Sequence, residues 1–467
     1  MLDPKNWEET KQIGHRMLDD LFEYLEHLRD TPVWTYAPDA IRDHFHAPLP
    51  EQPQPLDAVY DEFKKYIWPY IGGNIHPGFM GWAQGGGTAV GMLAELLAAG
   101  LNANLGGRDH IPILVERQIT LWLSELLHFP KTASGLFVTG TSLANFMALL
   151  IAKTNASGTS SRVEGVSPLL RGYTSQATHS CVIKAFEMAG LGSKGLRIVP
   201  MNVEDLQAAV DKDRSEGLQP FIVIANAGTV DTGAIDDLQA LHRFCKKEKL
   251  WFHIDGAIGA LGMLSPRIAP LLKGIEHADS IALDFHKWGQ VPYEAGFILV
   301  RDAKKQLETF AAEGAYLKRA KKGMAAGDIW PCDYGPNLSR GFQALKTWFT
   351  IKAYGAESLG KMIEHTCDLA SYAAKKILAS DHLELLAPVT LNIVCFRYKA
   401  ASLKRSNEIN QAIVEELQLS GRVAPSTTLI DGKLAIRAAF FNHRTSYADV
   451  DYLLTRVLDT KVFQTQQ

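Results

Sequence analysis

Two short apolar runs, each closed by a charged cluster, constrain this chain more than any other feature. Residues 251–254 lead into Asp255, and residues 280–283 lead into a segment that contains Lys287. Continuous apolar runs of this length are typical of strands buried on both faces of a parallel sheet. Side chains just past the carboxyl ends of such strands point into the ligand crevice of an open α/β sheet. We therefore expect Asp255 and Lys287 to share one crevice.

The surrounding sequence alternates apolar runs with helical patterns from about residue 86 to residue 360. This alternation predicts a mostly parallel sheet covered on both faces. Further strands are predicted at residues 135–139, 196–199, 221–225 and 296–300. Beyond residue 361, runs at 391–396 and 434–437 and a helix at 447–458 indicate a smaller α+β domain. We expect three parts: an N-terminal helical segment over 1–85, a large domain over 86–360 and a small domain over 361–467.

Composition and charge exclude several classes of protein. With 46% hydrophobic and 21% charged residues, the chain is typical of a soluble globular protein. A net charge of −3 gives no reason to expect nucleic acid or an anionic membrane as partner. We find neither a signal-peptide pattern nor an apolar run long enough to span a bilayer. Five dispersed cysteines favour reduced thiols, so the sequence predicts a cytoplasmic protein.

A buried lysine and a carboxylate in one crevice suit pyridoxal phosphate (PLP), which needs a lysine amine and a partner for its pyridinium nitrogen. The segments HIDGA (253–257) and DFHKW (284–288) resemble the cofactor-binding core of fold-type I PLP enzymes, specifically the group II amino-acid decarboxylases. Similar segments extend from about residue 10 to residue 445. The resemblance implies a seven-stranded, mostly parallel sheet, PLP as cofactor and a small-molecule amino acid as substrate. It also implies a homodimer, in which the N-terminal segment wraps around the second subunit.

The resemblance gives roles to the residues around the cofactor ring. Lys287 would form the Schiff base, Asp255 would pair with the pyridinium nitrogen, and Ala257 would lie against one ring face. His179 matches the histidine that stacks on the other face, where its nitrogen reaches the substrate. Each residue also has an ordinary reading by itself: Lys287 as an ion-paired lysine, Asp255 and His179 as helix caps.

A turn of small residues supplies the predicted phosphate site. Thr139-Gly140-Thr141-Ser142 follows a strand and opens a helix, where free N–H groups and hydroxyls suit an anion. Thr141 replaces a glycine of the family pattern, so its hydroxyl is expected to meet the phosphate, together with Ser142. His286 is a further phosphate ligand by resemblance. Asp284 is left unassigned, because a carboxylate facing the phosphate would repel it.

Two other segments are expected near the site. Residues 226–236 resemble a family turn in which Thr229 hydrogen-bonds around the ring and Asp236 caps the next helix. Trp82 and Gly85 follow an H-P-x-F entrance motif and are predicted to approach the substrate. The polar segment 106–110 stands where aromatic-substrate members have apolar pocket residues. That departure argues against an aromatic substrate, although Trp82 is compatible with one.

The segment 311–340, including residues 313–316, resembles a mobile catalytic loop with Gly323 and Gly327 as hinges. Many family members carry a loop tyrosine that protonates the carbanionic intermediate in the partner subunit. A gapless comparison places Pro331 at that position, and Tyr334 is the candidate substitute. Without a donor, the intermediate would be diverted, for instance to an aldehyde by reaction with oxygen. Arg437 resembles the arginine that clamps the substrate carboxylate in aminotransferases, and we expect it to be structural here.

The sequence thus favours decarboxylation of an L-amino acid to an amine and CO2, with Lys287, His179 and Tyr334 as catalytic residues. An aldehyde-forming oxidative deaminase or a carbon–carbon lyase would use the same cofactor. A different class, a metal-binding or non-catalytic protein, would gather His253, Asp255 and His286 in a ligand cluster. That reading leaves Lys287 and the phosphate turn without a role, so no metal is predicted.

Overall fold

The computed structural model describes residues 2–311, 319–327 and 329–459. The chain divides into two compact units. The central unit comprises Ala83–Ser371 and Ala387–Val394, and the terminal unit comprises Met1–Trp82, Tyr372–Leu386 and Cys395–Gln467. The terminal unit therefore combines the N-terminal segment with most of the C-terminal residues.

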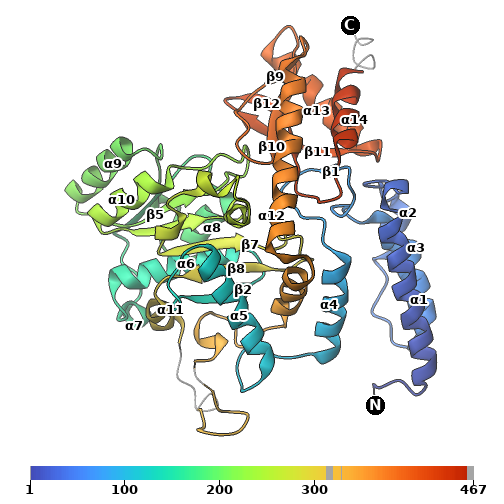
Figure 1. Ribbon diagram of the computed structural model, residues 1–467, viewed down its shortest axis with the longest axis horizontal. Helices are drawn as coiled ribbons and strands as arrows, with labels where there is room; N and C mark the ends of the chain where they lie inside the picture. Colours follow the sequence, from blue (N-terminus) through green and yellow to red (C-terminus); the bar gives the residue numbers. More distant parts are fainter. Residues whose placement is uncertain (1, 312–318, 328, 460–467) are drawn as a thin grey trace. The chain divides into compact units, whose positions relative to one another are not determined.

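A seven-stranded sheet forms the centre of the central unit, in the order β2-β8-β7-β6-β5-β3-β4 (Figure 1). Only β8 runs antiparallel to its neighbours β2 and β7, and the other pairs are parallel. The predicted seven-stranded, mostly parallel sheet is confirmed. The strands are β2 Ser134–Val138, β3 Leu170–Thr174, β4 Leu196–Ile198, β5 Gln219–Asn226, β6 Trp251–Asp255, β7 Ser280–Asp284 and β8 Gly296–Val300.

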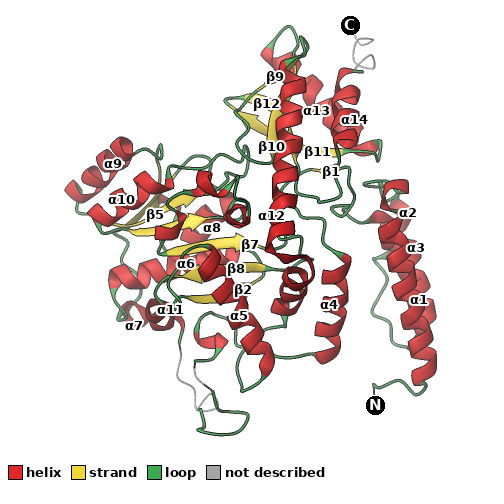
Figure 2. Cartoon of the chain, viewed as in Figure 1, coloured by secondary structure: helices red, strands yellow, loops and turns green. Residues whose placement is uncertain are grey.

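Burial explains why these segments form strands. Every residue of β6, β7 and β8 is buried, so both faces of the middle of the sheet are covered. One face packs against α6 (Thr141–Ser157) and α8 (Ser180–Met188) in a shared apolar cluster. The other helices of the central unit (Figure 2) are α4 Ala89–Leu101, α5 Ile111–Leu126, α7 Ser161–Glu164, α9 Val203–Ser215, α10 Leu238–Glu248 and α11 Ala303–Phe310.

Helix α12 (Gln343–Leu378) consists of two helical stretches that meet at Gly355, whose φ of 75° lies in the left-handed region. In the terminal unit, five strands follow the order β1-β11-β12-β10-β9. The predicted helix at 447–458 coincides with α14. The terminal elements are α1 Trp7–Glu26, α2 Asp39–His44, α3 Leu56–Tyr66, β1 Phe79–Met80, β9 Leu383–Leu385, β10 Ile393–Tyr398, α13 Leu403–Leu419, β11 Ala424–Ile430, β12 Lys433–Ala439 and α14 Tyr447–Leu458.

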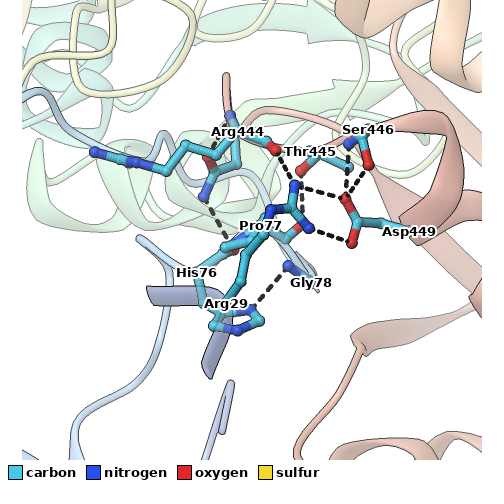
Figure 3. Close-up of polar contacts among 9 residues, drawn as sticks. Arg29, His76, Pro77, Gly78, Arg444, Thr445, Ser446 and Asp449 are labelled. Carbon is cyan, nitrogen blue, oxygen red and sulfur yellow. Dashed lines mark hydrogen bonds and ion pairs between the residues drawn. The ribbon is translucent and has the colours of Figure 1, made fainter. Parts of the chain in front are cut away.

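Within the terminal unit, the predicted entrance motif is held by the turn that precedes α14 (Figure 3). Arg29 donates two hydrogen bonds to the carboxylate of Asp449 and a third to the carbonyl of Arg444. Thr445 Oγ1 donates to the carbonyl of Pro77 at 2.7 Å. His76 Nδ1 accepts from the backbone N–H of Gly78 at 2.9 Å. These contacts fix the backbone just ahead of Trp82.

All five cysteines are free and buried. Across the described part of the chain, no helix has the length and apolar character that crossing a membrane requires.

Candidate active site

The predicted cofactor residues converge because five parallel strands end at the same edge of the central sheet, here called the carboxyl edge. Thr141 follows β2, His179 follows β3, Thr229 follows β5, Asp255 ends β6 and Lys287 follows β7. The strand register aligns these carboxyl ends side by side. Asp255 pairs with Asn226 of β5, and both Val138 and Asp284 pair with Gly296 of β8. The sheet topology therefore assembles one site from residues far apart in the sequence.

Asp255 is the buried last residue of β6, and hydrogen bonds fix its carboxylate. Oδ2 accepts from Asn145 Nδ2 at 2.8 Å, and Oδ1 accepts from the backbone N–H of Ala257 at 3.1 Å. Burial raises the pKa of Asp255, while the charge of Lys287 and the two hydrogen bonds oppose that rise. A buried carboxylate with a nearby cation and free lone pairs suits a protonated ring nitrogen.

Lys287 is paired with Asp284, the residue that the sequence left unassigned. Its Nζ lies 2.8 Å from Asp284 Oδ2, and the lysine side chain keeps 17% of its surface exposed. Asp284 Oδ1 accepts from the backbone N–H of Thr141 at 2.8 Å, at the first residue of α6. Burial raises the pKa of Asp284, but the charge of Lys287 and the hydrogen bonds from Lys287 and Thr141 outweigh it and hold the pKa below the usual value. The amine is therefore held at the carboxyl edge and remains reachable.

The start of α6 fits a phosphate through hydroxyl groups. Asp284 occupies the backbone N–H of Thr141, but Thr141 Oγ1 is buried and has no hydrogen-bond partner among the described residues. Ser142 is exposed beside it. His286 Nδ1 accepts from the backbone N–H of Ala295 at 3.2 Å, so a neutral ring carries its proton on Nε2 and can donate. Burial lowers the pKa of His286 to about 4, which keeps the ring neutral at pH 7.

His179 forms the N-cap of α8 and is exposed. Its Nδ1 accepts from the backbone N–H of Cys181 at 3.2 Å, so a neutral imidazole carries its proton on Nε2. Cys181 itself contacts Asn145, which hydrogen-bonds Asp255. The start of α8 therefore lies beside Asp255, and the stacking role of His179 stays a prediction.

The turn after β5 differs from the prediction in one residue. Thr229 is buried, and its hydroxyl contacts Thr232 Oγ1 and accepts from the backbone N–H of Ala234 within the turn. Asp236 was expected to cap the next helix, and that prediction was wrong. Asp237 is the N-cap of α10, while Asp236 accepts from the backbone and side chain of Asn226. A carboxylate one residue earlier stabilises the strand end instead of the helix.

The two predicted substrate residues lie in different units. Gly85 belongs to the central unit and donates its N–H to the carbonyl of His286 at 3.0 Å. A Cβ at Gly85 would lie 2.4 Å from the carbonyl oxygen of Lys287, so only glycine permits this contact. Trp82 ends the first segment of the terminal unit, where its side chain is exposed. Its carbonyl accepts from Arg437, a contact that agrees with a structural role for this arginine.

Tyr334 lies away from Lys287 within one chain. Its carbonyl accepts from Gln306 Nε2, and Gln306 Oε1 in turn accepts from Ser134 Oγ at the start of β2. Ser134 and Ser280 both pair with Val300, so Tyr334 lies near the amino edge of the sheet. A five-residue strand, about 15 Å long, separates this edge from the carboxyl edge. The phenol packs against the apolar cluster, and burial raises its pKa.

The described part of the predicted loop is anchored on the polar segment 106–110. Trp330 is buried, with the guanidinium groups of Arg108 and Arg319 over its ring at 5.0 and 5.3 Å. Gly107 permits the contact, since a Cβ there would lie 2.5 Å from the indole. Gly323 and Gly327 adopt positive φ angles of 84° and 102°. Residues 313–316, also predicted to be in this loop, lie outside the described residues.

The metal-binding alternative gains no support from the described residues, which bring together no group of three His, Cys, Asp or Glu side chains suited to a metal ion. His253 and His286 have different partners. His253 contacts Asn145 and Ser280 inside the sheet, whereas His286 accepts from Ala295 and lies against Tyr293.

Comparison with known proteins agrees with this geometry. Residues 38–399 match the family model of the pyridoxal-dependent decarboxylase conserved domain. The aromatic-L-amino-acid decarboxylase of Bacillus atrophaeus is 32% identical over 96% of this chain and 95% of its own length. A phenylacetaldehyde synthase of Arabidopsis thaliana is 27% identical over 94% of this chain and 93% of its own. The crystal structure of Oryza sativa TDC with PLP and tryptamine superposes with a TM-score of 0.91 at 23% identity, covering 98% of this chain and 100% of that chain.

The fold and the residues at the carboxyl edge define a class of proteins, the PLP-dependent enzymes with a large, mostly parallel sheet. The family match narrows that class: this chain belongs to the pyridoxal-dependent decarboxylase family. It is accordingly a PLP-dependent carboxy-lyase of amino-acid metabolism, and its predicted cofactor is confirmed.

Proposed function

We propose that the protein decarboxylates an L-amino acid to the amine and CO2, with Lys287 as the residue that holds PLP covalently. The observation that carries this proposal is the convergence of a partly exposed lysine and a buried, hydrogen-bonded aspartate at one edge of the sheet. The strands β6 and β7 are parallel neighbours, so Asp255 at the end of β6 and Lys287 just after β7 lie at the same edge of the sheet.

The proposal assigns a role to each predicted residue at the carboxyl edge. When bound, PLP supplies an aldehyde that condenses with amines and a ring that withdraws electrons from the bond being broken. Asp255 would accept a hydrogen bond from the ring nitrogen, and the hydroxyls of Thr141 and Ser142, with His286 Nε2–H, would hold the phosphate. His179 and Ala257 would lie against the ring, and Thr229 would shape the turn beside them.

Asp284 gives the Lys287 amine a defined position in the site. The carboxylate lies three residues before Lys287 and binds its Nζ at 2.8 Å. Because the same carboxylate also accepts from the Thr141 N–H, its position is fixed by the start of α6. Lys287 therefore has a defined resting place within the site, from which it can hold or deliver a proton at Nζ.

Trapping with borohydride tests this proposal. Protein incubated with PLP and reduced is expected to carry one phosphopyridoxyl group per chain, on the peptide that contains Lys287. Lys153 is a suitable control, because burial lowers its pKa and makes it the competing reactive amine. Lys287→Ala should abolish labelling and Lys153→Ala should leave it intact. Labelling at Lys153, or no labelling at all, would refute the proposal.

A second candidate is formation of an aldehyde, ammonia and peroxide with oxygen as co-substrate. One observation favours it: a phenylacetaldehyde synthase is among the relatives. Incubation with a panel of L-amino acids, followed by measurement of amine, aldehyde and peroxide, separates the two reactions. Amine without peroxide supports decarboxylation, and stoichiometric peroxide supports the alternative.

We propose that the protein acts as a homodimer in the cytoplasm. Helix α1 carries apolar side chains at helical spacing, Ile13, Met17, Leu21 and Leu25, yet none of its residues is buried within the chain. The five free, buried cysteines suit a reducing compartment. Sedimentation equilibrium of the full chain tests the dimer, with a single species of monomer mass as the opposing result.

A further inference from the structure

A series of buried polar side chains extends from Asp255 along one face of the sheet. Trp251, His253 and Asp255 alternate along β6, so their side chains lie on one face. Ser280 is the register partner of His253 on β7, and Asn145 comes from the second turn of α6. All five are at least 94% buried, and His253 and Ser280 are fully buried. No solvent is available to satisfy these groups, so they must satisfy one another.

Four short contacts connect them in series. Trp251 Nε1 lies 2.9 Å from Ser280 Oγ, which lies 2.9 Å from His253 Nδ1. His253 Nε2 lies 2.8 Å from Asn145 Oδ1. Asn145 Nδ2 then donates to Asp255 Oδ2 at 2.8 Å. We call this series the Trp251–Asp255 relay.

The chemistry of its two ends gives the relay a direction. The Trp251 indole can only donate, and an ionised Asp255 can only accept. Ser280 Oγ therefore accepts from Trp251 and donates to His253 Nδ1. Asn145 uses its N–H groups on Asp255 and on Cys181, so its Oδ1 must accept from His253. This requires a neutral His253 with its proton on Nε2.

One further contact competes with this arrangement. His253 Nδ1 also lies 3.1 Å from the carbonyl oxygen of Ser280, which would accept a proton placed on Nδ1. That placement would leave the lone pair of Nε2 facing Asn145 Oδ1 at 2.8 Å, two acceptors without a donor. A doubly protonated ring would satisfy both sides, but burial lowers the pKa of His253 to about 4. The Nε2–H form therefore prevails at neutral pH.

We propose that the relay is a positioning device for the proposed reaction. It delivers a hydrogen bond of fixed direction to Asp255, keeps the carboxylate ionised despite its burial, and aims the remaining lone pairs at the ring nitrogen of the cofactor. His253, Ser280 and Trp251 are positioning residues that act through Asn145. This inference rests on the proposed function, because it takes Asp255 as the partner of the ring.

The position of the proton can be measured without cofactor. Neutron diffraction from deuterated crystals of the full chain is expected to show deuterium on His253 Nε2 and none on Nδ1. In Ser280→Ala the hydroxyl is lost but Asn145 Oδ1 still faces Nε2, so deuterium should stay on Nε2. Deuterium on Nδ1 in the parent protein, alone or together with Nε2, would overturn the relay.

Kinetics and cofactor binding provide the second test. Ser280→Ala should weaken PLP binding about tenfold and lower kcat about tenfold with KM nearly unchanged, since one hydrogen bond to a charged group is lost indirectly. Thr174→Val is the matched control, because it also removes a fully buried hydroxyl of this sheet, one that donates to the carbonyl of Ile224. It should change both values less than twofold. Trp251→Phe, which keeps an aromatic ring, should give a smaller effect in the same direction as Ser280→Ala.

The outcomes separate the two proposals. If borohydride labels Lys287 but Ser280→Ala and Thr174→Val behave alike in PLP binding and kcat, the relay is wrong and the proposed function stands. If Lys287 is not labelled, both proposals fail. Circular dichroism of each variant shows whether it is folded, and the proton position in the parent protein decides the relay even where a variant does not fold.

Discussion

Asp284 Oδ2 lies 2.8 Å from Lys287 Nζ, and Asp284 Oδ1 accepts from the first N–H of α6. One buried carboxylate therefore binds both the reactive amine and the helix start that is proposed to receive the phosphate. The sequence gives no role to Asp284, because a carboxylate that faced the phosphate would repel it. The structure removes this objection, because the Asp284 carboxylate faces Lys287 and its charge is balanced by the lysine.

Asp284→Asn is expected to destabilise the cofactor-free protein by about 2–3 kcal/mol at pH 7, because it removes the counter-charge of a partly buried lysine. The pKa of Asp284 lies below 3.8 in the folded chain, so its stabilisation is present above that pH and is lost as the pH falls through the folded pKa. Chemical denaturation from pH 7 to pH 3 should show the parent and variant converging below about pH 3.8.

Asp61→Asn serves as the control, since Asp61 is 66% exposed and lies 3.9 Å from Arg16. It should match the parent at every pH. A difference between parent and Asp284→Asn that stays constant down to pH 3 would argue against the ion pair as its source.

The sequence predicted the central strands well where burial is continuous, as in β6, β7 and β8. It missed β3 (Leu170–Thr174), which contains Arg171 and Gly172 and therefore lacks an apolar run. Gly172 is required by packing, since a Cβ there would lie 2.4 Å from the ring of Phe186. Strand β11 was missed for a similar reason: Pro425, Ser426 and two threonines give it little hydrophobicity. Tertiary contacts stabilise both strands.

The site residues also divide into those that the sequence identifies and those that only the structure reveals. Motif resemblance identified the residues at the strand ends, but Asn145 and Asp284 became visible only when their distances to Asp255 and Lys287 were known. Alternation of Trp251, His253 and Asp255 was a usable signal, since three such residues on one face of a buried strand need polar partners. The partners themselves come from α6 and β7, which no local pattern connects.

Tyr334 is expected to act on the site of a second subunit, because it lies at the amino edge of its own sheet. Tyr334→Phe should lower amine formation about 100-fold, the usual effect of losing a general acid, and should raise the share of aldehyde. A heterodimer of Lys287→Ala and Tyr334→Phe chains contains one site with both groups intact. Its amine formation should reach about half of the parent value.

Differently tagged chains, co-expressed and purified through both tags, provide that heterodimer. The control is a mixture of the two variant homodimers, which should show only the residual activity of Tyr334→Phe. A heterodimer no more active than this mixture would mean that Tyr334 donates no proton to the partner site.

A buried ion pair connects the last residue of the predicted loop, Arg340, to α5, and a hydrogen bond connects it to β2. Arg340 donates to both carboxylate oxygens of Glu116 and to the carbonyls of Leu105 and Phe137. Glu116→Gln leaves the guanidinium without its counter-charge and should cost about 3–5 kcal/mol in the free energy of unfolding. Glu357→Gln breaks an exposed pair with Lys361 and should leave the denaturation midpoint unchanged. Equal effects of the two substitutions, measured by denaturation at pH 7, would contradict this account.

Trp330 is expected to hold the described part of the loop against the central unit. The guanidinium groups of Arg108 and Arg319 lie over its ring, its Nε1 donates to the carbonyl of Ala326, and the neighbouring Ile329 carbonyl accepts from Arg117. Trp330→Leu removes both cation–π contacts and this indole hydrogen bond. Trypsin should then cut after the exposed Lys321 and Lys322 at least tenfold faster than in the parent.

Trp348→Leu is the control, since Trp348 is partly buried and also donates through Nε1, to Gln118 outside the loop. Its cleavage rate at Lys321 and Lys322, followed by mass spectrometry, should equal that of the parent. Local opening limits proteolysis when the folded core stays intact, so a faster rate at these two sites alone reports release of the loop. Faster cleavage throughout the chain would instead indicate global unfolding, and unchanged cleavage in Trp330→Leu would show that the two arginines and the indole do not hold the segment.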